Sequence, residues 1–117
     1  MSTPSAAVAA RVQGLRRSAP IFAALGDETR LTLVARLGAG ERLSTSNLTE
    51  GTDITRQAVT KHLTVLEGAG LVRSTRAGRE TLWELEPKRL GDARKALDTI
   101  ARHWDSAFDR LRDLVER

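Results

Sequence analysis

The sequence predicts one small α+β domain that is mainly helical and carries a single β-hairpin. Three observations lead to this fold class. Apolar residues recur at helical spacing along most of the chain, two runs of strand-forming residues flank Ala77-Gly78, and 117 residues leave room for one domain. With 40% hydrophobic and 29% charged residues, the composition is globular. We expect the domain to span residues 6–117, after a frayed stretch at residues 1–5.

The N-terminal part predicts an amphipathic helix over residues 6–17. Its apolar face consists of Val8, Val12 and Leu15. Pro20 is expected to break this helix, because proline has no amide hydrogen to donate and its ring clashes with the preceding turn. A separate apolar turn is predicted at residues 21–25.

Two more helices with clear start signals are predicted before the middle of the chain. Asp27 occupies an N-cap position ahead of a mostly buried helix that Gly38 and Gly40 end. Residues 41–43 form a short extended piece, after which Ser44 caps another short helix.

The next helix is expected over residues 56–69, with Thr55 as its N-cap and Gly70 as its stop signal. Its inward positions are Val59, Leu63 and Leu66. Its outward positions are Arg56, Gln57, Thr60, Lys61 and Thr64. None of these outward residues is acidic.

Beyond this helix the pattern changes to the chemistry of strands. The runs at residues 71–76 and 81–86 predict a two-stranded hairpin with Arg76 and Arg79 at its tip. Pro87 ends the second run.

The last segment has the strongest helical periodicity and predicts one long helix over residues 88–116. Its apolar residues alternate three and four apart, which is typical of a coiled-coil seam: Leu90, Ala93, Leu97, Ile100, Trp104, Ala107, Leu111 and Leu114. Such a seam favours self-association. Together with the apolar face of the first helix, it gives the candidate interface Val8, Val12, Leu15, Leu97, Ile100, Trp104, Ala107, Phe108 and Leu111.

Two short helices joined by a tight turn and followed at once by a hairpin are typical of a winged helix-turn-helix, which places its second helix in the DNA major groove. Residues 54–83 carry five cationic side chains against two carboxylates, a net +3, whereas residues 27–53 carry three against five, a net −2. The predicted DNA-binding residues are Thr55, Arg56, Gln57, Thr60, Lys61, His62, Thr64, Arg76 and Arg79.

Chemistry suggests a role for each kind of side chain. Arg56 and Gln57 suit bidentate contacts to guanine and adenine, Thr60 offers a methyl group to thymine, and Lys61 suits a phosphate. His62 is equally suited to a phosphate contact and to a local hydrogen bond. The hairpin arginines either contact phosphate or the minor groove, or protect an edge strand from pairing.

Three motifs resemble the ArsR/SmtB family of bacterial repressors: ALGDETRL at residues 24–31, RQAVTKHLTVLEGAGLV at residues 56–72, and Gly-Arg at residues 78–79. The resemblance covers residues 21–117. It implies a homodimer built on the first and last helices that binds double-stranded DNA at an imperfect inverted repeat in a promoter and represses transcription.

The sequence departs from the metal-sensing branches of that family. Residues 43–48 read LSTSNL, with serines where the arsenic-sensing branch has two cysteines. The zinc-binding positions of the other branch correspond to Asp92, Arg94, Asp105 and Phe108, which do not form a zinc site. His103, beside several aspartates, is interpreted as a solvated side chain. We therefore expect no metal and no cofactor, and the sequence names no small-molecule effector.

Several function classes are excluded or disfavoured. The chain has no cysteine, no glycine-rich phosphate loop and no paired-histidine motif, which argues against an enzyme. No apolar run approaches the roughly 20 residues of a membrane span, and no signal peptide is recognisable, so a cytoplasmic protein is expected. A sequence-specific transcriptional regulator is the leading hypothesis. The alternatives are a nonspecific architectural DNA binder and a winged-helix protein-interaction module.

Overall fold

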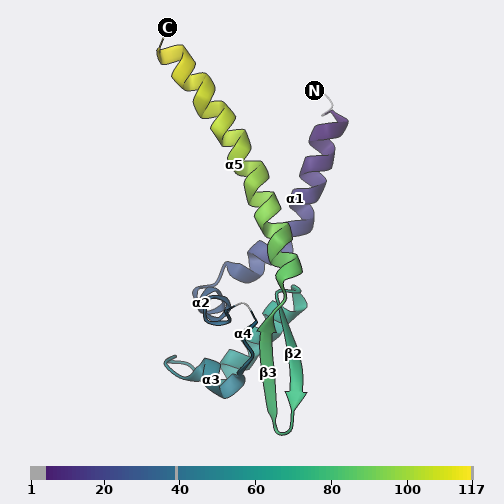
Figure 1. Ribbon diagram of the computed structural model, residues 1–117, viewed down its shortest axis with the longest axis vertical. Helices are drawn as coiled ribbons and strands as arrows, with labels where there is room; N and C mark the ends of the chain where they lie inside the picture. Colours follow the sequence, from purple (N-terminus) through teal and green to yellow (C-terminus); the bar gives the residue numbers. More distant parts are fainter. Residues whose placement is uncertain (1–4, 39, 117) are drawn as a thin grey trace.

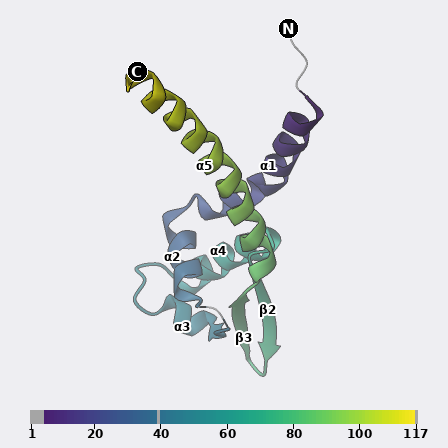
Figure 2. The ribbon, with the colours of Figure 1, turned by 45° about the horizontal axis from the view of Figure 1, so that its top comes forward.

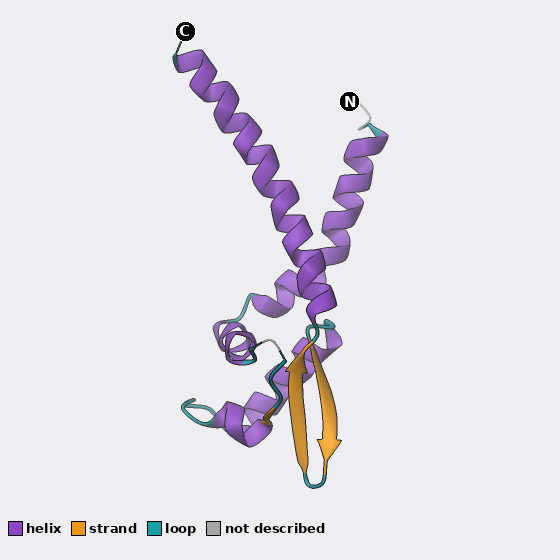
Figure 3. Cartoon of the chain, viewed as in Figure 1, coloured by secondary structure: helices purple, strands orange, loops and turns teal. Residues whose placement is uncertain are grey.

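The computed structural model describes residues 5–38 and 40–116. Its elements, in chain order, are α1 (Ala6–Leu25), α2 (Glu28–Arg36), β1 (Leu43–Ser44), α3 (Thr45–Thr49), α4 (Arg56–Gly68), β2 (Val72–Ala77), β3 (Glu80–Leu85) and α5 (Pro87–Val115). Figure 3 shows that helices dominate and that the strands form one small sheet, which confirms the predicted fold class.

The molecule has two distinct ends (Figure 1). At one end, α2, α3, α4 and the β2–β3 hairpin pack together. At the other, α1 and α5 diverge as the two sides of a V, with the chain termini at its open end; the rotated view in Figure 2 shows the same arrangement. The molecule is elongated for this reason, at 65 × 31 × 26 Å.

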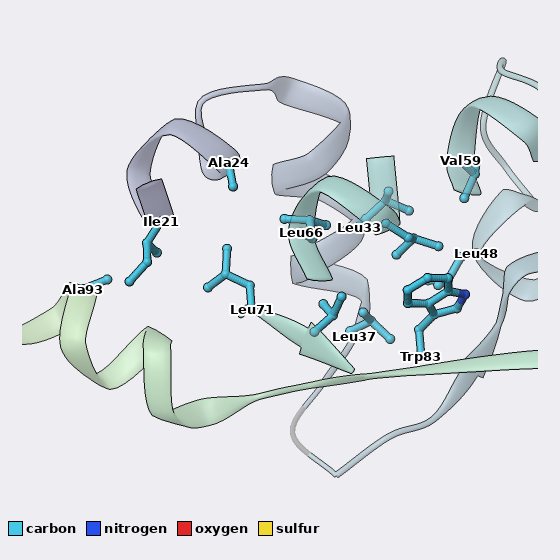
Figure 4. Close-up of a cluster of buried hydrophobic side chains, with 12 residues drawn as sticks. Ile21, Ala24, Leu33, Leu37, Leu48, Val59, Leu66, Leu71, Trp83 and Ala93 are labelled. Atoms are coloured by element: carbon cyan, nitrogen blue, oxygen red, sulfur yellow. The ribbon is translucent and has the colours of Figure 1, made fainter. Parts of the chain in front are cut away.

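One apolar core holds the compact end together and reaches the base of the V (Figure 4). Its members are Ile21, Ala24, Leu33, Leu37, Leu48, Val59, Leu63, Leu66, Leu71, Val72, Trp83 and Ala93. The indole Nε1 of Trp83 donates a 2.9 Å hydrogen bond to Thr45 Oγ1, so the polar atom of this buried side chain is satisfied. This bond also joins β3 to α3.

The sheet has three antiparallel strands in the order β1-β3-β2, where the sequence predicted two. The hairpin register pairs Ser74 with Trp83 and Ala77 with Glu80. The third strand is β1, whose Leu43 pairs with Trp83. The predicted extended piece at residues 41–43 was the only local sign of it, and a two-residue strand is too short for an alternating pattern to reveal.

The prediction that Pro20 separates two helices was wrong, because α1 continues through it to Leu25. Proline removes the hydrogen bond to the Arg16 carbonyl, and Figure 1 shows the helix bending near its lower end. Ile21 and Ala24 are buried in the core just after the proline, and this packing keeps the following turn helical. The predicted frayed residues 1–4 lie outside the described residues, while Ser5 is the N-cap of α1.

Helix α2 is less buried than the sequence predicted. Asp27 caps it as expected, and its side chain accepts from the Arg30 amide at 3.0 Å. Leu33 is buried, but Leu31 is 54% exposed, so the helix is not mostly buried. The helix lies at the edge of the compact end and buries one face only.

Candidate DNA-binding surface

The position of α4 follows from its cap and its apolar face. The Thr55 hydroxyl accepts a 3.1 Å hydrogen bond from the Ala58 amide and fixes the start of the helix. The inward side chains Val59, Leu63 and Leu66 are fully buried, as predicted. The opposite side of the helix, which we call the α4 face, is exposed and consists of Arg56, Gln57, Thr60, Lys61 and Thr64.

The α4 face presents two kinds of side chain. The hydroxyls of Thr60 and Thr64 donate to backbone oxygens one turn earlier, at 2.9 and 2.8 Å. Their hydroxyl protons are therefore used within the helix, and both residues offer methyl groups and acceptor lone pairs to a ligand. Arg56, Gln57 and Lys61 supply the exposed donors and the positive charge.

His62 is turned away from the α4 face toward the start of α2. It is partly buried, with its Nδ1 atom 3.4 Å from Arg30 Nη1 and 3.8 Å from Asp27 Oδ2. Arg30 Nε also donates a 2.6 Å hydrogen bond to the Ala24 carbonyl at the end of α1. Of the two roles left open by the sequence, this geometry favours the local contact.

Asp27 completes this cluster. The hydrogen bond from the Arg30 amide is the main reason that the pKa of the Asp27 carboxyl is below its ordinary value, and the electrostatic effects of the neighbouring Arg30 and His62 act in the same direction. Residues of the ALGDETRL motif therefore have a structural role, because their contacts connect α1, α2 and α4.

Arg36 fixes α3 in a comparable way. Its guanidinium donates to the carbonyl oxygens of Leu48 at 2.7 Å, Glu50 at 3.0 Å and Asn47 at 2.9 Å. These are the carbonyls left unpaired at the C-terminal end of a short helix. Sequence reasoning missed both Arg30 and Arg36, because their partners lie 6 to 32 positions away in the chain.

The wing is a tight hairpin whose two-residue turn is Gly78-Arg79, one position later than predicted. Gly78 has φ of +63°, a left-handed conformation that suits glycine. Arg76 and Arg79 are exposed at the tip. Arg73, in contrast, is paired with Glu84 at 3.6 Å and Glu86 at 3.3 Å.

The wing and α4 are joined directly. Glu67 Oε2 accepts from the Ser74 amide at 3.0 Å and from the Ser74 hydroxyl at 2.5 Å. Glu67 is the one acidic residue of α4, and these hydrogen bonds direct its carboxylate toward β2. Figure 1 shows that the wing extends at the end of the molecule away from the V.

The predicted interface residues lie at the other end of the molecule. The side chains of Ile100, Trp104, Phe108 and Leu111 are 41%, 58%, 59% and 58% exposed. The rings of Trp104 and Phe108 lie with their centroids 5.9 Å apart and their planes tilted by 34°. Val8 and Val12 on α1 are 37% and 40% exposed. Leu15 and Ala107 are partly covered.

Two features are absent from residues 5–38 and 40–116. No group of three or more histidine, cysteine, aspartate or glutamate side chains in this part of the chain is placed to hold a metal ion. None of its helices is long and apolar enough to cross a membrane.

Sequence comparison identifies relatives of this fold and site. The helix-turn-helix domain family matches residues 25–75, which run from the end of α1 into β2. The HTH-type transcriptional regulator Rv2034 of Mycobacterium tuberculosis is 36% identical over 93 residues, which cover 80% of this chain and 83% of the relative. The uncharacterized HTH-type transcriptional regulator YuzN of Bacillus subtilis is 46% identical over 65 residues, 50% of this chain and 71% of that one.

Comparison with solved structures leads to the same kind of protein. An ArsR-like transcriptional regulator from Rhodococcus sp. RHA1 superposes with a TM-score of 0.68 and 32% sequence identity, over 85% of this chain and 92% of that one. The likeness therefore extends beyond the compact end, residues 26–85, which make up about half of the chain. The chain belongs to the ArsR-like family of winged helix-turn-helix proteins, which are DNA-binding transcriptional regulators.

Proposed function

We propose that this regulator is a homodimeric repressor that binds an imperfect inverted repeat in a promoter. The observation that carries the proposal is that one chain has two distinct exposed surfaces at opposite ends. A cationic, acid-free α4 face lies at the compact end, and a half-exposed apolar seam lies on α1 and α5 at the other.

The seam supports self-association. Monomeric proteins rarely expose large contiguous apolar patches, and aromatic residues are enriched at the centres of interfaces. The exposed seam runs over more than three turns of α5, from Leu97 to Leu111. A second copy of the same helix supplies an apolar face of matching period.

The α4 face then reads DNA in each half-site. Arg56 and Gln57, in the first turn of α4, contact base edges in the major groove. Lys61 binds phosphate, and Arg76 with Arg79 extend the contact to the neighbouring backbone or minor groove. His62 positions α4 through Arg30 and Asp27 and does not itself contact DNA.

Two α4 helices related by a twofold axis match an inverted repeat whose half-sites lie about one helical turn apart, roughly 34–36 Å. Occupation of such a site in a promoter excludes RNA polymerase, which gives repression without any catalytic step. The protein acts in the cytoplasm, where bacterial DNA is held.

The test is selection of the purified protein against a random duplex pool at about 0.15 M salt, where nonspecific binding is already weakened. We expect enrichment of an inverted repeat. Retention without enrichment would identify an architectural binder, and no retention would leave a protein-interaction module. An in vitro transcription assay on the selected site then separates repression from activation.

A further inference from the structure

A cationic groove lies at the base of the V, where α1 and α5 are closest. It has a volume of about 430 Å³, within the size range of small-molecule sites. Four cationic side chains line it, Arg11, Arg17, Arg89 and Lys95, against one carboxylate, Asp92. The local charge is therefore +3, and a concave surface of one sign raises the local concentration of opposite charge.

The Arg89 guanidinium in this groove has no close hydrogen-bond partner among the described side chains. Arg89 Nη1 lies 3.8 Å from Asp92 Oδ2, which is beyond hydrogen-bond distance. Ser18 also lines the groove and is only 4% exposed, and its hydroxyl reaches the Gly14 carbonyl at a long 3.4 Å. A guanidinium without a short partner can donate to ligand oxygens.

We propose that this groove binds a small metabolite that carries a carboxylate or phosphate group. Guanidinium groups match both anions with paired donors, and the lysine adds a point charge. Gly14 and Ala96 have small side chains at the same site, which leaves space for the ligand.

Arg89 connects the groove to the end of α4. Its stem crosses Gly70, where an added Cβ atom would lie 2.9 Å from Arg89 Cγ. Gly70 ends the helix, donating to Glu67 O at 2.9 Å, and Leu71 donates to Leu66 O at 3.0 Å. A ligand that draws the Arg89 guanidinium into the groove shifts the stem that packs on this turn. The consequence for DNA affinity rests on the proposed function of α4.

Binding is tested without DNA, so its failure is distinct from failure of the proposed repressor. The full-length protein is titrated with inorganic phosphate and, separately, with succinate at constant ionic strength, while backbone amide NMR signals are followed. We expect saturable shifts at Arg17, Ser18 and Lys95, and at Gly70 and Leu71. Binding of one probe alone identifies the class of anion, and absence of saturable binding for both overturns the proposal.

Matched variants separate a site from general charge attraction. Arg17→Gln with Lys95→Gln removes two groove cations and should weaken binding at least about tenfold, as loss of two charged hydrogen-bonding groups implies. Arg16→Gln with Lys88→Gln removes one arginine and one lysine that do not line the groove, and should change affinity by less than about twofold. Equal losses in both pairs would overturn the site.

Arg89→Met tests the connection to α4. It keeps an unbranched stem across Gly70 and removes the guanidinium. We expect the Arg17 and Lys95 signals still to shift at higher anion concentration, while the Gly70 and Leu71 signals no longer respond. An unchanged Gly70 response would overturn the role of Arg89. All variants change exposed charges or an exposed side-chain end, and their NMR spectra report directly whether they fold.

Discussion

The compact end of the molecule and its two diverging helices differ in how far their apolar side chains are buried. In the DNA-binding head, residues 26–85, Leu63, Leu66 and Leu71 are completely buried within one chain. In the arms, residues 6–17 and 97–115, Trp104 and Leu111 remain 58% exposed. The core of the head is completed within one chain, with Ile21 and Ala24 of α1 and Ala93 of α5, whereas the apolar side chains of the arms stay about half exposed.

The largest effect should come from charging the arms. Leu97→Glu with Ile100→Glu places unpaired carboxylates in the apolar seam, and an uncompensated buried charge costs about 3–5 kcal/mol. We expect monomers in sedimentation equilibrium, with the head still folded by circular dichroism. Asp98→Asn with Asp109→Asn changes the net charge by the same magnitude in the opposite direction, at exposed polar positions of α5, and should leave the dimer intact. A dimer that survives the glutamates would move the interface elsewhere.

A cavity in the head should weaken folding itself. Leu63→Ala removes a fully buried side chain from α4, and such changes cost about 2–5 kcal/mol. Urea unfolding should show this loss independently of protein concentration. Leu111→Ala, in the arm, should show a smaller loss that depends on concentration. If both variants lost the same unfolding free energy with the same concentration dependence, the distinction between head and arms would be wrong.

A change on the α4 face should alter recognition and leave both folding and assembly intact. Gln57→Ala should relax base preference at one position in each half-site and cost about 1–3 kcal/mol on the preferred sequence. The check is binding to the selected duplex and to single-base variants of it. A uniform loss on every sequence would assign Gln57 to the DNA backbone.

The smallest effect concerns acid stability of the head. The pKa of the folded Asp27 carboxyl is below the ordinary value of 3.8. The ionised carboxylate therefore contributes stability above that value, and the contribution is lost as the pH falls through the lowered pKa. Asp27→Asn keeps a side chain that can cap α2 and removes the charge. Its unfolding free energy should be below the wild type near pH 6, and the difference should shrink in acid. A difference independent of pH would contradict this account.

Local signals were sufficient for much of the fold. The caps at Asp27, Ser44 and Thr55, the apolar face of α4 and the period of α5 each act within a few residues, so the sequence alone predicts these elements. The hairpin was predicted with its turn one position too early.

The remaining features depend on contacts between distant segments. Packing of Ile21 and Ala24 keeps α1 helical beyond Pro20, and pairing with β3 turns two residues into β1. The α4 face could be predicted because one helix contains it. The contacts of Arg30 and Arg36 could not be predicted, because they join α2 to residues of other helices that are distant in the sequence.

The most direct test compares the DNA selected by the wild type with that selected by the Leu97→Glu, Ile100→Glu variant under identical salt. If the arms join two heads, the wild type should enrich an inverted repeat, and the variant should enrich only a single half-site with lower affinity. Enrichment of the same full inverted repeat by both proteins would contradict the account, because the heads would then pair on DNA without the arms.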